Sequence, residues 1–322
     1  MYAIQVDGEQ LAWAAFEPSE CHEGEVRIGV QATAINRADL IQRSGGYPPP
    51  PGASPIMGLE CAGEVLEVGE GVTRVQVGDS VCALLSGGGY ATEVVVPAGQ
   101  VLPIPAGLSM AQAAAIPEVF ATAYLNLYME GALKAGEHVL LHAGASGVGT
   151  AAIQLLKQSG NPSYVTAGGA DKIDQCIALG ADGGFDRHNG SFVDDVRAWA
   201  GEAGVDLVLD PVGAGYLADN LTVLALGGRL VLIGLMSGAQ TEISLGALMM
   251  KRARIIGSTL RARPIAEKAL VMDGLARDVW PDLAAGDIKP IIEAKFPIEE
   301  TAKAHELLAS NTTVGKVVLE IS

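Results

Sequence analysis

The chain has 322 residues, 49% of them hydrophobic and 18% charged, and 37 acidic against 21 basic residues give it a formal charge of −16. This excess of negative charge repels nucleic-acid phosphates and anionic lipid, so we expect neither a nucleic acid nor a membrane as a partner. The chain has no run of about 18 apolar residues and no basic start followed by an apolar stretch, so we expect no transmembrane helix, no signal peptide and a cytoplasmic location. The length suggests about two domains.

The first third of the chain, residues 1–115, predicts strands and turns. Residues 24–35 alternate apolar and polar side chains, as a half-buried strand does, and residues 60–84 and 87–105 carry short β-branched runs separated by glycines. The run GGYPPPPGASP at 45–55 cannot be helical, because proline removes backbone donors and forces the preceding residue into extended geometry. We expect a rigid surface loop there.

Helices enter the pattern near residue 109. Ser109 is a suitable N-cap for a short helix, and residues 120–134 predict a longer one. From residue 137 short apolar strands alternate with helices, which predicts a parallel sheet covered on both faces, a doubly wound α/β fold. We expect strands at 138–144, 163–168, 183–186, 205–213 and 228–235, helices at 146–160, 171–181, 191–201 and 215–226, then a strand at 252–260, a helix at 264–284 and a last strand at 316–322.

The most informative segment is the turn Gly144-Ala-Ser-Gly147-Val-Gly149 between a predicted strand and a predicted helix. Glycines let the chain turn sharply and let backbone amides approach a pyrophosphate, and the helix N-terminus supplies N–H groups and positive dipole character. The spacing is G-x-x-G-x-G rather than the commoner G-x-G-x-x-G, and a plain tight turn is the alternative. Its place between a strand and a helix favours dinucleotide binding. The candidate binding residues are Gly144, Ala145, Ser146, Gly147 and Val148.

The end of the next predicted strand distinguishes between the two nicotinamide cofactors. An acidic side chain there holds the ribose hydroxyls of NAD, but this strand ends in Gly168-Gly169 without a carboxylate. Lys172 and Arg187 follow, and both could pair with a 2′-phosphate, so we expect NADP. Asp171 is discordant, since it could either cap its helix or oppose the phosphate, and ordinary solvated charge is the alternative for the two cations.

Two further glycines end apolar strands, Gly213 in DPVG and Gly234 in LIGLM. Ligands of open parallel sheets bind beyond the carboxyl ends of the strands, so both glycines could line the cofactor groove. Turn formation is the alternative for each of them.

Seven motifs follow one another along nearly the whole chain. They are Asn36-Arg-Ala-Asp39, the tyrosine–proline loop at Tyr47, Gly58-Leu-Glu60, Gly78-Asp79, AAAIPEVFATAY at 113–124, HAGASGVGTAAIQL at 142–155 and GKVVLEI at 315–321. In this order they resemble the zinc-free quinone oxidoreductases, the zeta-crystallin-like branch of the medium-chain dehydrogenase/reductase superfamily. Each motif alone is weak evidence, but together they are specific.

The resemblance implies a two-domain fold. A Rossmann domain at 116–255 would be inserted into a β-rich, chaperonin-10-like (GroES-like) substrate domain made of 1–115 and 256–322, with the cofactor in the cleft between them. It further implies a homodimer that joins the sheets of two Rossmann domains.

The resemblance also implies roles for individual residues. Asn36 and Tyr47 would lie in the substrate cleft, and Thr122 at the nicotinamide. Backbone from Ala145 to Val148 would surround the pyrophosphate. The adenosine ribose would lie among Gly168, Gly169, Lys172 and Arg187. The family often has serine at Gly169, lysine at Asp171 and tyrosine at Arg187.

We expect no metal. Catalytic zinc needs three protein ligands around an open position. Where zinc-dependent relatives place cysteine and histidine, this sequence has Asn36 and Leu59, and Glu60 alone is no site. The four cysteines show no C-x-x-C spacing, and Cys61 and Cys82 lie in apolar runs typical of buried strands, so we expect reduced thiols with a packing role. His142, at a strand end, is interpreted as structural.

The expected function is an NADPH-dependent quinone reductase that transfers a hydride or electrons to a quinone without metal or flavin. Asn36 or Tyr47 could donate a hydrogen bond to the acceptor oxygen as negative charge develops there. The alternatives are an Asx-type turn for Asn36, packing beside prolines for Tyr47, and a proton taken from solvent.

Two other functions stay open. One is reduction of an activated C=C bond in an alkenal or enoyl thioester, for which Arg261 and Arg263 are the close candidates to hold a coenzyme or carrier phosphate. The other is a non-catalytic NADPH-binding protein, as when crystallins are recruited for their solubility.

Overall fold

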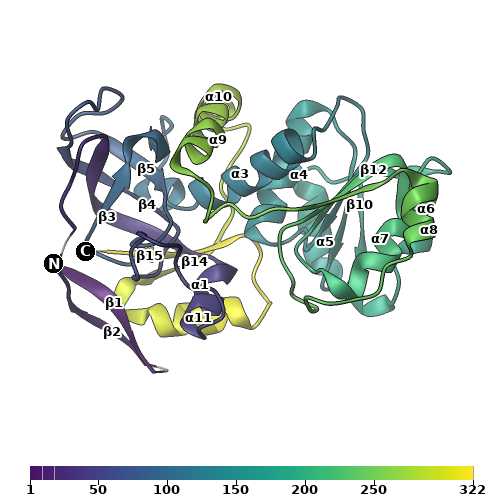
Figure 1. Cartoon of the computed structure of the whole chain (residues 1–322), viewed down its shortest axis with the longest axis horizontal. Coiled ribbons are helices and arrows are strands. Elements are labelled where there is room, and N and C mark those ends of the chain that lie inside the picture. The colour runs from purple at the N-terminus through teal and green to yellow at the C-terminus, as the bar shows by residue number, and fades with distance from the viewer. Residues whose placement is uncertain (9, 18, 322) are drawn as a thin grey trace. The chain divides into compact units, whose positions relative to one another are not determined.

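The computed structural model describes residues 1–8, 10–17 and 19–321, and the chain divides into two compact units (Figure 1). The first unit combines Met1–Ala121 with Leu260–Ser322, and the second is Thr122–Thr259. In chain order the second unit is therefore inserted into the first. Every helix in the described part of the chain is too short or too polar to span a lipid bilayer.

A largely antiparallel sheet forms the core of the first unit. Its strands are β3 (Glu25–Ile35), β4 (Glu60–Val68), β5 (Ser80–Leu84), β6 (Glu93–Pro97), β7 (Val101–Pro103), β14 (Ile292–Pro297) and β15 (Lys316–Glu320). They lie in the order β14-β15-β3-β4-β5-β7, with β6 also paired to β3. Strand β15 pairs antiparallel with β3 and parallel with β14, so the last segment of the chain completes a sheet that an early segment begins.

Strand β3 shows why this sheet forms. In its first half every second residue is buried, and Val26, Ile28 and Val30 pack with apolar residues of the neighbouring strands. This alternation confirms the strand expected at 24–35, because burying one apolar face drives the pairing. The proline-rich segment at 45–55 contains neither helix nor strand, as predicted.

Helices and a hairpin complete the first unit. They are the hairpin β1 (Tyr2–Asp7) and β2 (Gln10–Ala15), the helices α1 (Arg37–Arg43), α2 (Met110–Ala113), α3 (Pro117–Tyr124, which ends in the second unit), α9 (Ile265–Asp278), α10 (Trp280–Ala285) and α11 (Thr301–Ala309), and the 3-10 turns η1 (Ala98–Gln100) and η5 (Ile298–Glu300). Ser109 is the N-cap of α2, as expected, and its hydroxyl accepts a hydrogen bond from the backbone N–H of Gln112.

A parallel six-stranded sheet forms the second unit, in the order β10-β9-β8-β11-β12-β13. The strands are β8 (Val139–His142), β9 (Ser163–Ala167), β10 (Gly183–Asp186), β11 (Val205–Asp210), β12 (Leu224–Leu232) and β13 (Arg254–Gly257). The helical elements are α4 (Gly147–Ser159), α5 (Ala170–Leu179), η3 (Arg187–Asn189), α6 (Val193–Ala200), η4 (Ala214–Tyr216), α7 (Leu217–Val223) and α8 (Leu245–Lys251). The chain reverses its direction of travel across the sheet between β8 and β11.

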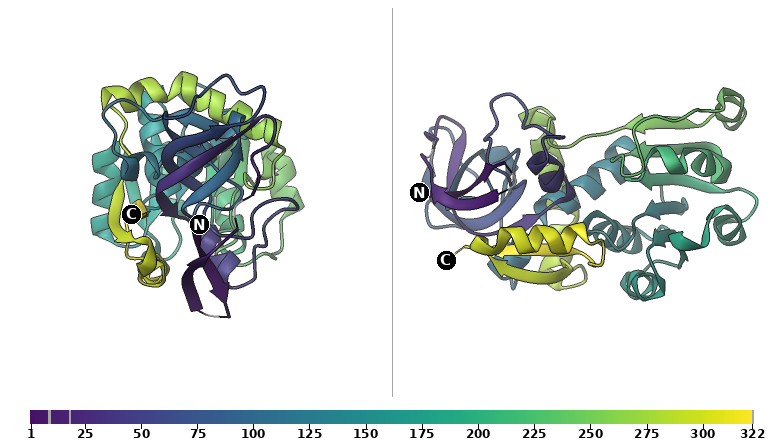
Figure 2. Two further views of the ribbon diagram at one scale, coloured as in Figure 1. Left: turned by 90° about the vertical axis from the view of Figure 1, so that its left-hand side faces the viewer. Right: turned by 90° about the horizontal axis from the view of Figure 1, so that it is seen from below.

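The helices of this unit lie on both sides of its sheet (Figure 2). On one side Val196 of α6 and Leu221 of α7 are buried against Leu140, Val208 and Leu230 of the strands. Helix α4 buries a continuous set of its own residues from Gly149 to Leu156. These findings confirm the predicted doubly wound α/β architecture.

Several predicted elements were wrong in their limits. The helix expected at 215–226 ends at Val223, because Leu224 already pairs with Val205 and so begins β12 ahead of the strand expected at 228–235. The helix expected at 120–134 consists of α3 followed by the π-helix η2 (Leu125–Glu130). The helix expected at 264–284 breaks at Val279, and α10 starts afresh with Pro281 in its first turn, where a missing N–H does no harm.

Candidate functional site

The turn between β8 and α4 is shaped so that only glycine fits at two positions. A Cβ added to Gly144 would lie 2.6 Å from the Val165 Cβ, and one added to Gly149 would lie 2.3 Å from the Gly144 carbonyl oxygen. Ala143, ahead of them, has a φ of 54°. The chain therefore closes on itself here more tightly than a side chain at either position would allow.

Helix α4 begins directly at this turn. Ser146 is its N-cap, and the Ser146 Oγ accepts a hydrogen bond of 3.1 Å from the Gly149 N–H. The first amides of a helix have no acceptor inside the helix, and its dipole favours negative charge at this end. Gly144 and Ala145 are buried, whereas Ser146 is exposed. The structure thus brings all five predicted turn residues together at the N-terminus of α4.

A buried polar chain crosses the carboxyl ends of the neighbouring strands. Thr166 Oγ1 lies 2.9 Å from His142 Nδ1, His142 Nε2 lies 2.6 Å from Asn220 Oδ1, and Asn220 Nδ2 donates to Asp210 Oδ2 at 2.9 Å. Because Asn220 donates to Asp210, its oxygen accepts from His142 Nε2–H, and His142 Nδ1 accepts from the threonine hydroxyl. Burial lowers the pKa of His142, so the imidazole is neutral. Asp210 also accepts the Gly213 N–H at 3.1 Å.

This series of buried hydrogen bonds supports the expected structural role of His142. The series joins β8, β9, α7 and β11 beside the point where the strand order reverses, which is the usual place for a ligand in such sheets. Sequence reasoning missed Thr166, Asn220 and Asp210. The only signal was the strand-ending DPVG that contains Asp210.

Arg187 lies against the glycines that end β9. A Cβ on Gly168 would be 3.1 Å from the Arg187 Nε. Gly169 has a φ of 100°, and its N–H donates to Asp186 Oδ1 at 3.1 Å. The same oxygen lies 2.8 Å from His188 Nδ1, so the Asp186 carboxylate at the end of β10 is already engaged. Arg187 and the two glycines are thus gathered as predicted.

The other predicted cofactor residues occupy separate places in the second unit. Lys172 lies in the first turn of α5 and is half-buried. A Cβ on Gly234 would lie 2.7 Å from the Pro211 carbonyl oxygen, so the loops after β11 and β12 approach closely. Thr122 lies in α3, where its carbonyl accepts a 2.7 Å hydrogen bond from Asn126 Nδ2.

In the first unit Asn36 belongs to a closed set of hydrogen bonds. Its Nδ2 donates to Glu60 Oε1 at 3.0 Å and to the Ala34 carbonyl at 3.3 Å, and its Oδ1 accepts from Lys316 Nζ at 2.6 Å. Lys316 also pairs with Glu60 at 2.8 Å, and both side chains are almost fully buried. The second oxygen of Glu60 accepts the Glu118 N–H at 2.9 Å, at the start of α3. Both amide hydrogens of Asn36 are therefore used inside the protein.

Tyr47 is held by a residue from the far end of the sequence. The guanidinium of Arg261 lies 5.2 Å from the centre of the Tyr47 ring and donates to the Tyr47 carbonyl at 3.2 Å. It also donates to the Ser86 carbonyl and to Gln42 Oε1, both at 2.8 Å. Burial, and then the negative charge of Glu118, raise the pKa of Tyr47 against the opposing charge of Arg261, so the phenol keeps its proton.

No group of three or more histidine, cysteine or acidic side chains able to hold a metal ion occurs within residues 1–8, 10–17 and 19–321. Cys61 and Cys82 are fully buried, and burial raises the pKa of both thiols. This agrees with the packing role expected for them.

Two family models match the chain. The alcohol dehydrogenase GroES-like domain matches residues 22–106, and the zinc-binding dehydrogenase matches residues 147–275. The quinone oxidoreductase of Rattus norvegicus is 30% identical over 297 residues, which cover 92% of this chain and 88% of that protein. A mycocerosic acid synthase-like polyketide synthase of Mycobacterium tuberculosis is 32% identical over 98% of this chain, but the chain spans only 15% of that protein.

Solved structures show the same fold. Quinone oxidoreductase of Escherichia coli complexed with NADPH has a TM-score of 0.85 and 30% identity, with 99% of this chain and 98% of that chain covered. The apo JamJ enoyl reductase has a TM-score of 0.88 at 24% identity, with 100% and 99% covered, a likeness of fold. The chain thus shares a GroES-like unit and a Rossmann-like sheet with these proteins.

Proposed function

The chain belongs to the medium-chain dehydrogenase/reductase superfamily of oxidoreductases, and we propose that it is an NADPH-dependent quinone reductase that works without a metal. The observation that carries the proposal is the glycine turn at the start of α4, because a helix N-terminus that follows such a turn binds diphosphates in dinucleotide-binding folds. We further assign it to the zinc-free, zeta-crystallin-like branch, near the tumour-suppressor-inducible NADPH quinone oxidoreductase, on its motifs and on the absence of a metal-ligating group in the described residues.

In this proposal the Rossmann domain, 116–255, holds the cofactor. Amides from Ala145 to Val148 bind the diphosphate, and Gly168, Gly169, Lys172 and Arg187 surround the ribose phosphate. Thr122 and Gly234 lie toward the nicotinamide. The close fit of Gly144 and Gly149 supports the assignment, because a side chain at either position would collide with Val165 or with the backbone of the turn and so distort it. When bound, NADPH supplies the hydride.

The substrate domain, 1–115 with 256–322, contributes the polar groups for the acceptor. Tyr47 offers a protonated phenol, which can donate to an oxygen that gains negative charge. Arg261 fixes the loop that carries it. Asn36 has no amide hydrogen to spare, so in the proposal it positions Lys316 and Glu60 while Tyr47 faces the quinone.

Reduction of an activated C=C bond is the second candidate, favoured by the 32% identity to a polyketide synthase. The two cations predicted to hold a carrier phosphate, Arg261 and Arg263, are bonded to other groups of the protein. Arg261 is 3% exposed and bonded within the protein, and Arg263 pairs with Glu267 at 3.0 Å. These engagements favour a small acceptor without a phosphate-bearing carrier.

The test is NADPH oxidation by the purified chain with ortho-quinones, alkenals and an enoyl thioester. We expect turnover with quinones. Turnover with the thioester alone would support the second candidate, and NADPH binding without turnover would support a crystallin-like protein.

Gly149→Ala should abolish NADPH binding, because its methyl group would lie 2.3 Å from the Gly144 oxygen. Gly246→Ala is the matched control, since its nearest contact is 4.0 Å away.

A further inference from the structure

The ammonium group of Lys316 is enclosed by three oxygen atoms of the first unit. Lys316 Nζ donates to Asn36 Oδ1 at 2.6 Å and to the Ile35 carbonyl at 2.7 Å, and it pairs with Glu60 Oε1 at 2.8 Å. The side chains of Lys316 and Glu60 are only 4% and 0% exposed. A lysine ammonium has three N–H donors, so three oxygens at these distances match all of them. The oxygens therefore surround a cation that belongs to the protein itself.

The pairing of the strands in the first unit produces this enclosure. Strand β3 lies between β15 and β4. Lys316 is the first residue of β15, Glu60 is the first residue of β4, and Asn36 directly follows the last residue of β3. Because β15 and β4 both run antiparallel to β3, their first residues lie beside the end of β3. The backbone of the sheet therefore brings the three side chains together.

The carboxyl groups around Lys316 create a need for positive charge there. Glu60 is fully buried, and a buried ion is costly unless it is paired and hydrogen-bonded. Burial raises the pKa of Asp39 and of Glu118, and the charge of Lys316 opposes the rise in both. Asn36 completes the arrangement, because its Nδ2 donates to Glu60 Oε1 while its Oδ1 accepts from Lys316. The ammonium thus balances charge that the fold has already buried.

The residues in this place do not fit catalytic zinc. The zinc-binding dehydrogenase model that matches residues 147–275 suggests such a metal. Catalytic zinc takes three protein ligands, which are cysteine, histidine or acidic side chains, around an open position. Here the donors are one carboxylate, one side-chain amide and one main-chain carbonyl, and all three oxygens lie within 2.8 Å of Lys316 Nζ. A metal ion could reach them only if the ammonium moved away.

We propose that Lys316 supplies, from within the chain, the positive charge that a metal ion would otherwise bring to Asn36 and Glu60, and that it closes this place to metals. This inference goes beyond the proposed function, and its test needs no turnover, so a chain that fails to reduce quinones leaves the result unchanged. Because the cation is covalently attached, its presence does not depend on the supply of metal. Removing it should leave a site for a small organic cation.

The first test replaces the ammonium from solution in the full-length chain. Lys316→Ala removes the atoms beyond Cβ, which are those of n-propylammonium. Its Tm should be roughly 5–15 °C below that of the native protein, because Glu60 then lacks its counter-charge. n-Propylammonium chloride should raise this Tm progressively, as a ligand of the folded state does. Sodium chloride at the same ionic strength should not.

Lys295→Ala is the matched control for this test. Lys295 also lies on a strand of the same sheet and pairs with Glu320 at 3.3 Å, but its side chain is 46% exposed. The Tm of this variant and of the native protein should respond equally to n-propylammonium and to sodium chloride. If the amine stabilises Lys316→Ala no more than Lys295→Ala, the proposal is wrong.

A second comparison decides the matter if Lys316→Ala does not fold. Lys316→Met fills the space of the lysine without its charge, and Glu60→Gln added to it removes the unpaired carboxylate as well. The double variant should have a higher Tm than Lys316→Met, because replacing both members of a buried ion pair is less harmful than removing one. A double variant that is no more stable than Lys316→Met would overturn the proposal.

The closure to metals is tested on the native chain. Native protein and Asn36→Ala are incubated with Zn²⁺, dialysed, and compared by elemental analysis. Both should retain the same amount of zinc, because no metal reaches the oxygens around Lys316. Zinc that the native protein retains and Asn36→Ala loses would show that a metal enters this place, and would contradict the proposal.

Discussion

Asn36 shows how a polar residue at a plausible substrate position is committed by its neighbours. Its amide donates twice and accepts once within the protein. To donate to a substrate it would have to give up a buried bond, which costs about 1–3 kcal/mol. The sequence motif that contains Asn36 predicted a role toward substrate, but its hydrogen bonds show that it holds the Glu60–Lys316 ion pair.

At the same scale, Arg187 gives a direct test of cofactor choice. It lies against Gly168 at the end of β9, where the proposed ribose 2′-phosphate would be. Arg187→Ala should weaken NADPH binding tenfold to a hundredfold and should leave NADH binding unchanged. This loss corresponds to the roughly 1.5–3 kcal/mol that a hydrogen bond to a charged group contributes. Fluorescence titration of both cofactors measures this.

The control is Arg197→Ala, in α6 of the same unit, which should bind both cofactors as native does. Equal losses for NADPH and NADH in Arg187→Ala would contradict the assignment of this residue to the phosphate. Lys172→Ala tested in the same way shows whether the lysine shares that role.

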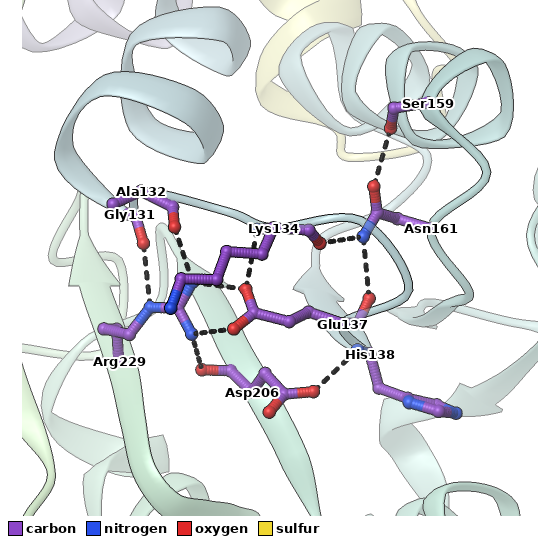
Figure 3. Close-up of polar contacts among 9 residues, drawn as sticks. All are labelled: Gly131, Ala132, Lys134, Glu137, His138, Ser159, Asn161, Asp206 and Arg229. Carbon is purple, nitrogen blue, oxygen red and sulfur yellow. Dashed lines mark hydrogen bonds and ion pairs between the residues drawn. The ribbon is translucent and has the colours of Figure 1, made fainter.

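At the scale of elements, β12 is tied to the amino ends of its neighbours by Arg229 (Figure 3). Its guanidinium makes two hydrogen bonds to Glu137, of 2.6 and 3.0 Å, and others to the Gly131, Ala132 and Asp206 carbonyls. Arg229 is 4% exposed. These hydrogen bonds lie at the amino ends of β8 and β11, whereas the glycine turn before α4 follows the carboxyl end of β8. Arg229 therefore serves stability rather than ligand binding.

Arg229→Ala should lower the free energy of unfolding by about 3–5 kcal/mol, because it removes the donor to three carbonyls and the cation that pairs with Glu137. Denaturant unfolding measures this, with exposed Arg254→Ala on β13 as the matched control, for which a change within about 0.5 kcal/mol is expected. A loss below about 1 kcal/mol in Arg229→Ala would contradict the structural role.

The same pair predicts a pH dependence. Burial opposes ionisation of Glu137, but the hydrogen bonds from Arg229 prevail and lower its pKa below the ordinary value. A carboxyl whose pKa is lower in the folded state stabilises the fold above its unfolded pKa, and this contribution disappears as the pH falls through the folded value. Lowering the pH should therefore reduce the free energy of unfolding more in the native protein than in the Arg229→Ala variant.

At the scale of the whole molecule, the parallel sheet of the second unit ends at the edge strand β13. Helix α8 directly precedes β13 in the chain, and its Leu245, Met249 and Met250 are exposed, as are Leu226, Leu235 and Met236 of the same unit. Large exposed apolar side chains can mark an interaction surface, and a homodimer through this edge of the sheet is the proposed assembly. The charge of −16 on each chain opposes association, so the dimer should tighten with salt.

Sedimentation should give twice the mass of the chain, and Met250→Glu, at a residue that is 81% exposed, should shift the protein to the monomer. Leu270→Glu on α9 is the matched control, because Leu270 is 61% exposed but lies in the other unit. A native chain that sediments as a monomer at all salt concentrations would contradict the dimer.

Local patterns were sufficient for much of the fold. The alternation in β3, the apolar strands of the parallel sheet and the glycine turn before α4 depend on neighbours a few residues away, so they could be predicted. The limits of α7 and β12 could not, because the pairing of Leu224 with Val205 overrides local helix propensity.

The amino-acid sequence alone determined the architecture and the glycine turn before α4, since both follow from the short-range periods and conformational limits of the residues involved. Only the tertiary structure decided which side chains act together. It brings Arg261 onto Tyr47 and joins Lys316 to Asn36 and Glu60 across the chain. It also sets the proton affinity of Glu118, because burial and the charges that surround a carboxyl are properties of the packed molecule.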